Sequence, residues 1–190
     1  MFDISGKISA LNMISEIKEV LKMLHGLYNS HMNKKKEDFY FYVTNIFEKS
    51  KMISNNYVDV LSSLRFNLIY NQWYGEESLE YLMKLEYDLK NERIYIREVL
   101  KSLNKVYDGK LENFVGGIFQ IMYCEKVNRH HTKDMEHRFS SLIRDARAFQ
   151  YNSTYKQDFL SNINQMLYDV NQAWLIVCHE YLLLKEENEI

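Results

Sequence analysis

The stretch from residue 160 to residue 184, LSNINQMLYDVNQAWLIVCHEYLLL, carries the signal that decides the fold class. Its large apolar side chains recur at alternating steps of three and four residues, at Leu160, Ile163, Leu167, Val170, Trp174, Val177, Tyr181 and Leu184. In an α-helix this spacing places the side chains on one stripe, and a sustained repeat of about 3.5 residues favours packing of nearly parallel helices. The stretch therefore predicts a long amphipathic helix packed lengthwise against others.

Three earlier segments show the same rhythm. The first runs through Ala10, Ile14, Ile17, Leu21, Leu24 and Tyr28. The second, with one polar interruption, runs through Phe39, Val43, Ile46, Ser50, Ile53, Tyr57, Val60 and Leu64. The third, also with one interruption, runs through Leu82, Leu85, Leu89, Glu92, Ile96, Val99 and Leu103. Four segments with this repeat favour a helical bundle.

Turn-forming residues divide the chain between these segments. They include Gly26 with residues 29–33, Gly75, and the pair Asp108–Gly109. The pattern predicts helices near residues 4–29, 35–71, 77–106, 110–127, 132–151 and 154–186. Residues 54–56 are poor helix formers, so they predict an interruption of the second helix.

Composition supports long helices. The 190 residues contain no proline and only 6 glycines, so few positions force a helix to end. The length fits one domain with a core that needs no disulfide. We therefore expect an all-α protein: a bundle of about six helices, several of them long, with coiled-coil-like heptad packing in a single domain over residues 1–190.

Charge, cysteine usage and the N-terminus lead to an expected location. The formal net charge is −2, which does not favour a general nucleic-acid binder. Cys124 and Cys178 lie far apart and form no metal-type pair, as is common in a reducing compartment. No signal peptide or membrane-length apolar run is present. We expect a cytoplasmic protein that does not enter a membrane, with a composition typical of AT-rich bacterial or phage genomes.

The fifth predicted helix carries a basic stripe opposite its apolar face. The stripe and its neighbouring histidines consist of Arg129, His130, Lys133, His137, Arg144 and Arg147. Clustered Lys and Arg attract polyanions by releasing counterions, so this stripe is the candidate site for an anion or a nucleic acid. A solvated helix face, partly neutralised by Asp134, Glu136 and Asp145, is the favoured interpretation because the whole chain is not basic.

The sequence contains no pattern that clearly indicates a metal or cofactor site. His130, Asp134 and His137 have the spacing of one helix face, but metal sites in bundles draw ligands from several helices. Gly116–Gly117 lacks the Lys-Ser/Thr of a phosphate loop and instead suggests a close helix approach or a kink. We therefore predict no metal and no cofactor.

Four consecutive aromatic residues, Phe39, Tyr40, Phe41 and Tyr42, surround almost the whole circumference of the second predicted helix. One core cannot cover every side of a helix, so part of this cluster is a candidate partner interface. The alternative is that the tyrosine rings lie flat on the surface with their hydroxyls in water.

These patterns favour an interaction protein or accessory subunit that acts through protein–protein contacts, by self-association or by binding a larger partner. The first alternative is a nucleic-acid or phosphate-binding module that uses the basic stripe. The second is a helical nuclease or metal enzyme whose site the sequence patterns do not reveal.

Overall fold

A computed structural model of the chain describes residues 5–32, 36–70, 83, 87, 111–123, 138–151 and 153–186. The elements are α1 (Ser5–Met32), α2 (Lys36–Ile69), α4 (Glu112–Tyr123), α5 (Arg138–Tyr151), the 3₁₀-helix η1 (Ser153–Tyr155) and α6 (Lys156–Glu186). These ranges contain no β-strand, so the all-α prediction is confirmed for the part of the chain they cover. The third predicted helix, over residues 77–106, lies outside the described residues apart from Met83 and Tyr87.

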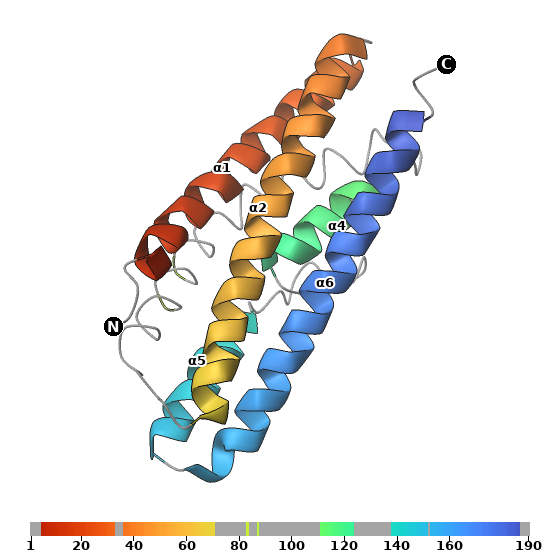
Figure 1. The fold of residues 1–190 in the computed structure, drawn as a ribbon. Coiled ribbons are helices and arrows are strands. Elements are labelled where there is room, and N and C mark those ends of the chain that lie inside the picture. Colours follow the sequence, from red (N-terminus) through yellow and green to blue (C-terminus); the bar gives the residue numbers. More distant parts are fainter. Residues whose placement is uncertain are drawn as a thin grey trace.

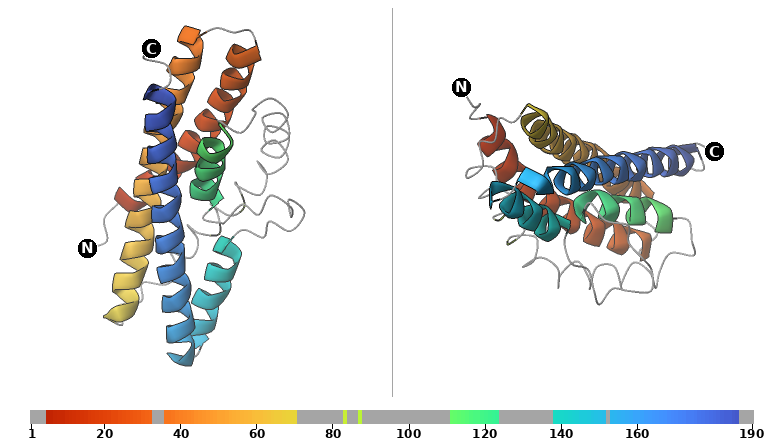
Figure 2. Two further views of the ribbon diagram at one scale, coloured as in Figure 1. Left: turned by 90° about the vertical axis from the view of Figure 1, so that its right-hand side faces the viewer. Right: turned by 90° about the horizontal axis from the view of Figure 1, so that it is seen from below.

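Three long helices form the frame of the molecule (Figure 1). α2 lies between α1 and α6 and packs against both of them. The chain runs up α1, down α2 and up α6, so both contacts are antiparallel. α4 and α5 lie one beyond the other along one side of α6, and α4 also contacts α2 (Figure 2). Among the described helices, α4 and α5 do not cover the opposite face of the α2–α6 pair (Figure 2).

Two helices continue through residues that the sequence predicts as breaks. α1 extends through Gly26 to Met32, and a side chain at position 26 would overlap the ring of Tyr42 on α2. The glycine therefore serves close packing between helices and does not end α1. α2 is continuous through residues 54–56, so the predicted interruption there is wrong. Ser54 is buried and Tyr57 is nearly fully buried, and tertiary packing overrides the weak local propensity.

The core stripe of α2 follows the predicted rhythm closely. Its buried positions are Val43, Ile46, Ser50, Ile53, Ser54, Tyr57, Leu61, Leu64 and Leu68. The stripe steps by four after Tyr57, so Leu61 is buried and the predicted Val60 is half-buried at its edge. The hydroxyl of Tyr57 donates a hydrogen bond of 2.8 Å to the carbonyl oxygen of Met122, which ties α2 to the end of α4.

The core stripe of α6 is rotated relative to the predicted one. Its buried residues are Phe159, Ile163, Met166, Asp169, Val170, Ala173, Val177 and Leu184. The predicted members Leu160, Leu167, Trp174 and Tyr181 are half-buried along the edge that faces α2. The rotation arises because α6 packs against α4 and α5 as well as α2, and the buried face is centred between these neighbours.

α4 is the most deeply buried of the described helices, with Phe114, Ile118, Phe119, Ile121 and Met122 all inaccessible to solvent. A Cβ atom at Gly117 would lie 2.7 Å from a methyl carbon of Val177 and 3.3 Å from the carbonyl oxygen of Ala173. The close helix approach expected at this glycine pair is therefore present, between α4 and α6. Gly116 has open space around it.

An ion-pair cluster fastens α1 to α2. The ammonium of Lys49 lies 2.6 Å from carboxylate oxygens of both Glu16 and Glu19. Hydrogen bonds to Glu16 and then to Glu19 raise the pKa of Lys49 above its ordinary value. Within the described ranges, no helix is both long and apolar enough to cross a membrane.

Candidate interaction surface

The two halves of α6 differ in what they show to solvent. From Gln157 to Gln165 the exposed side chains are amides, a carboxylate and a hydroxyl, as expected of an amphipathic helix. From Ala173 to Leu184 every residue except His179 and Glu180 is apolar or aromatic. A helix that is apolar on all sides is ordinarily buried, yet the core covers only one side of this one.

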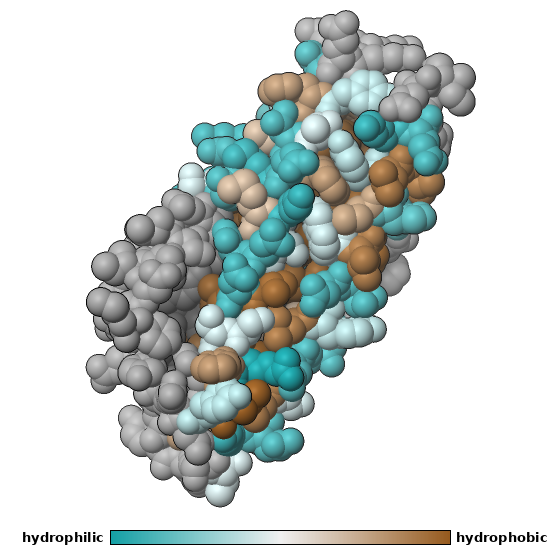
Figure 3. Space-filling view, in the orientation of Figure 1, coloured by the Kyte–Doolittle hydropathy of each residue, from teal (hydrophilic) through white to brown (hydrophobic). Residues whose placement is uncertain are grey.

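The uncovered apolar residues form the surface that we name the α6 ridge, defined as Leu175, Ile176, Leu182 and Leu183. Their exposed fractions are 60%, 39%, 56% and 41%, respectively. Figure 3 shows apolar side chains gathered over the C-terminal half of α6, on the face of the molecule that α4 and α5 do not cover. Large apolar side chains grouped in this way commonly mark a contact with another molecule.

Contacts on the α2 side of α6 fix how the ridge is oriented. The ring of Phe47 stacks on Trp174 with centroids 5.1 Å apart and on Tyr181 with centroids 4.0 Å apart. Cys178 lies at the same edge, where burial raises the pKa of its thiol and the positive charge of Lys51 lowers it by less. These contacts hold one flank of α6 against α2.

Contacts on the α4 side fix the other flank. Val177 and Ile176 lie against Gly117, and the side-chain amide of Asn113 donates a hydrogen bond of 3.3 Å to Glu180. His179 lies between the two pairs of ridge residues, and its Nδ1 is 3.6 Å from the same carboxylate oxygen of Glu180. With both flanks held, α6 cannot rotate to bury the ridge without losing its packing on α2 and α4.

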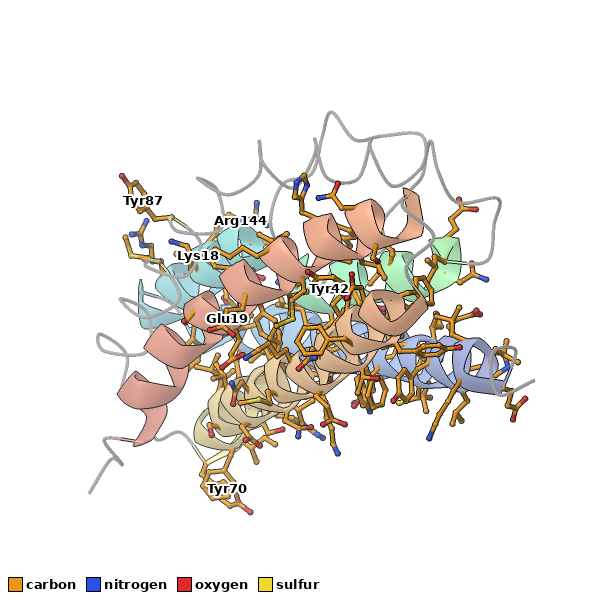
Figure 4. The ribbon with its side chains drawn as sticks, turned by 90° about the horizontal axis from the view of Figure 1, so that it is seen from above. Lys18, Glu19, Tyr42, Tyr70, Tyr87 and Arg144 are labelled. Atoms are coloured by element: carbon orange, nitrogen blue, oxygen red, sulfur yellow. The ribbon has the colours of Figure 1, made fainter. Side chains whose placement is uncertain are left out.

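The predicted aromatic interface at residues 39–42 is largely covered. Phe39 and Tyr42 pack against the core, and Figure 4 shows Tyr42 between α1 and α2. Tyr40 is half-buried, and its buried hydroxyl has no hydrogen-bonding partner in the described part of the chain. Phe41 is 61% exposed. A partner contact at this cluster therefore stays a prediction and would depend mainly on Phe41.

A second exposed apolar group lies at the C-terminal end of α2. Phe66, Ile69 and Tyr70 are exposed, with the rings of Phe66 and Tyr70 4.5 Å apart. Figure 4 shows Tyr70 directed away from the bundle.

The structure places two of the six residues predicted for anion or nucleic-acid binding. Arg144 and Arg147 are exposed on α5, opposite its buried Leu142 and Ala146. Arg144 lies 3.6 Å from Asp145, and a guanidinium nitrogen of Arg147 lies 3.2 Å from the sulfur of Met83. The other four, Arg129, His130, Lys133 and His137, lie outside the described residues, so the stripe as a whole stays a prediction.

The carboxylate beside this stripe has a structural contact. Asp145 accepts a hydrogen bond of 2.8 Å from the side-chain amide of Asn162, which also donates to Ser141 at 3.1 Å. These bonds link α5 to α6 and hold Asp145 beside Arg144. The described residues include no group of three or more His, Cys, Asp or Glu side chains that would hold a metal ion.

The sequence patterns did not reveal the α6 ridge, because one apolar stripe is enough to predict an amphipathic helix. The signal that identifies the ridge is the lack of polar residues on the opposite side of the same helix, from Ala173 to Leu184. No protein-family model, curated protein or solved structure matches this chain, so evidence about its function lies in the contacts and exposure of its own residues.

Proposed function

We propose that this chain is a helical interaction protein, an accessory subunit that works through protein–protein contacts and not by catalysis. The observation that carries the proposal is the α6 ridge, where four large apolar side chains face solvent on a helix whose orientation is fixed from both sides. The proposal includes the six-helix bundle with coiled-coil-like packing that the sequence predicts.

The apolar character of the ridge is not required by the fold. α2 packs against the same core, and between Glu48 and Ser63 its exposed residues are charged, amide or hydroxyl side chains apart from Met52. A polar outer face is therefore compatible with a long helix of this bundle. Removing apolar surface from water is favourable, so a partner that covers the ridge gains a driving force that the outer face of α2 between Glu48 and Ser63 does not offer.

Site-specific photo-crosslinking in the cells that produce the protein tests this function. A photoreactive amino acid at position 175 is expected to form covalent adducts with a second polypeptide, because Leu175 is the most exposed residue of the ridge. The matched control is position 55, because Asn55 is exposed on the polar outer face of α2. Adducts from position 175 should disappear when Leu182 is replaced by glutamate. No adduct from position 175, or equal adducts from both positions, contradicts the proposal.

A nucleic-acid or phosphate-binding module is the second candidate function. It is favoured by the position of Arg144 and Arg147, which lie three residues apart and exposed on the outer face of α5. Basic side chains on one helix face can follow a phosphate backbone, and affinity that depends on them falls steeply as salt rises.

A gel-shift titration against single- and double-stranded oligonucleotides across a range of salt concentrations tests this second function. Replacing Arg144 and Arg147 by glutamine is expected to weaken binding for all sequences and to flatten its salt dependence. The control pair is Lys51 and Lys185, which are exposed on α2 and α6. Absence of any shift at low salt rules the candidate out.

A further inference from the structure

We infer that the α6 ridge binds a second copy of this chain, and that the two copies pair through antiparallel contact of the C-terminal halves of α6. The inference rests on the proposed function, since it names the partner of the same surface. It depends on the area of the ridge, on the symmetry of its sequence and on the charges at its end.

The ridge has the area that a stable dimer needs at the centre of its interface. Leu and Ile are smaller than the aromatic side chains, which bury about 150–250 Å² each, so the exposed fractions correspond to roughly 300–400 Å² of apolar surface. A standard interface buries about 800 Å² on each partner, and somewhat more than half of it is apolar. The ridge therefore supplies most of the apolar part, and surrounding polar residues such as Asn171, Gln172 and Lys185 can supply the rim.

The ridge is symmetric about His179. Its members stand at four and three residues before His179 and at three and four residues after it. In an antiparallel pairing with the two-fold axis at His179, Leu175 lies opposite Leu183 of the other copy, and Ile176 lies opposite Leu182. Every ridge side chain then meets a ridge side chain, as an isologous interface requires.

The charges at the end of α6 favour the antiparallel orientation over the parallel one. A parallel pairing would place Glu186, one turn beyond Leu182 on the same helix face, beside its own copy, and it would align the two helix dipoles. In the antiparallel pairing the two copies of Glu186 are about 21 Å apart along the helices, and each lies opposite the uncharged Gln172. The ridge itself carries no charged side chain that would select a partner of opposite charge.

Analytical ultracentrifugation of the full chain over a range of concentrations is the first test. We expect a concentration-dependent species of twice the 22.9 kDa of one chain. Replacing Leu175 by glutamate should raise the dissociation constant of the dimer by more than about tenfold, because each interface then buries two unpaired carboxylates. The control is Met52→Glu, which adds the same charge at a residue of α2 that is 49% exposed. Circular dichroism should show that both variants remain helical.

Disulfide trapping is the second test and reports the orientation. In a background in which Cys124 and Cys178 are replaced by serine, chains carrying Leu175→Cys are mixed with chains carrying Leu183→Cys. We expect oxidation to link the two kinds of chain to each other and not to their own kind. Identical residues are about 12 Å apart along an antiparallel pair, beyond the reach of a disulfide.

The outcomes separate this inference from the function on which it rests. A strict monomer at all concentrations, or a dimer that survives Leu175→Glu or is lost with Met52→Glu, overturns self-association through the ridge. Linkage of Leu175→Cys chains to their own kind overturns the antiparallel arrangement. A monomer in solution whose position 175 crosslinks to a different protein in cells overturns the inference but supports the proposed function. A monomer with no crosslink overturns both.

Discussion

The outer faces of α2 and α6 differ although both helices pack against the same core. The middle of α2 shows Glu48, Lys51, Asn55 and Asp59 to solvent, whereas the C-terminal half of α6 shows the α6 ridge. The inner faces are alike, since each is a nearly continuous stripe of buried apolar side chains. The fold therefore accounts for the inner faces of both helices and for the largely polar outer face in the middle of α2, but not for the ridge.

The difference separates the apolar residues that serve folding from those that, under the proposed function, serve association. Burial measured within one chain identifies the first group, because those side chains lose their contact with water when the chain folds. The ridge residues keep between 39% and 60% of their surface exposed in the isolated chain. Substitutions on the two faces of α6 should therefore separate folding stability from association, and the following measurements are ordered from the largest expected effect to the smallest.

The largest effect is expected on the inner face of α6. Phe159→Ala removes a fully buried ring and should lower the free energy of unfolding by about 3–5 kcal/mol. Leu175→Ala on the outer face should lower it by less than about 1 kcal/mol when the chain is dilute enough to be monomeric. Urea denaturation followed by circular dichroism measures both. Similar losses for the two variants would remove the distinction between the faces of α6.

Two adjacent glycines of α4 should differ in how well they tolerate a side chain, because only Gly117 lies against α6. Gly117→Ala places a methyl group against Val177 and the backbone of Ala173, so it should destabilise the chain by about 1–3 kcal/mol. Gly116→Ala has open space and should stabilise the chain by up to about 1 kcal/mol through helix propensity. Thermal melts of the two variants beside the parent measure the difference. Equal shifts in melting temperature would mean that α4 and α6 do not approach at Gly117.

A smaller effect is expected where the inner face of α2 meets α4. Tyr57→Phe removes the hydroxyl that donates to the carbonyl oxygen of Met122 and leaves the packing of the ring in place. The free energy of unfolding should fall by about 1 kcal/mol, the usual net contribution of one hydrogen bond. Val58→Ala, at the half-buried edge of the same helix, serves as a control for packing alone. An unchanged denaturation midpoint for Tyr57→Phe would show that this bond contributes nothing.

The smallest effect is expected at the ion-pair cluster between α1 and α2. Lys49→Met should cost less than about 1 kcal/mol at neutral pH, because partly exposed ion pairs contribute little. The pKa of Lys49 is raised in the folded chain, so its contribution is complete below the ordinary value of 10.5 and is lost as pH rises through the folded value. The stability difference between parent and variant should therefore be constant near neutrality and shrink above that pH. A difference that grows with alkalinity would contradict this sign.

The sequence predicted the helices better than it predicted their ends and breaks. α2 was predicted over residues 35–71 and spans Lys36–Ile69, but it runs without the interruption that Ser54, Asn55 and Asn56 suggested. Gly26 suggested a helix end and instead provides room for Tyr42. In each case the local preference against helix amounts to about 1 kcal/mol or less, whereas burial of the surrounding side chains stabilises the continuous helix by more than that.

The candidate surface was harder to predict than the fold. Among the residues suggested from sequence, Arg144, Arg147 and Phe41 are exposed, whereas Phe39 and Tyr42 pack against the core. Nothing in the spacing of residues 39–42 distinguishes Phe41 from its neighbours, because four consecutive aromatics point in four directions on a helix. Which of them remains exposed depends on where α1 and α6 lie around α2.

The sequence by itself determined that this chain is helical and which residues share a helix face, because both follow from the period of the α-helix and from the absence of proline. The tertiary structure alone decided which apolar face of α6 is buried. The C-terminal half of that helix is apolar on both sides, so its period permits either face to enter the core. Packing on Phe47 of α2 and on Gly117 of α4 selects the face with Ala173 and Val177 and leaves Leu175 and Leu182 in solvent.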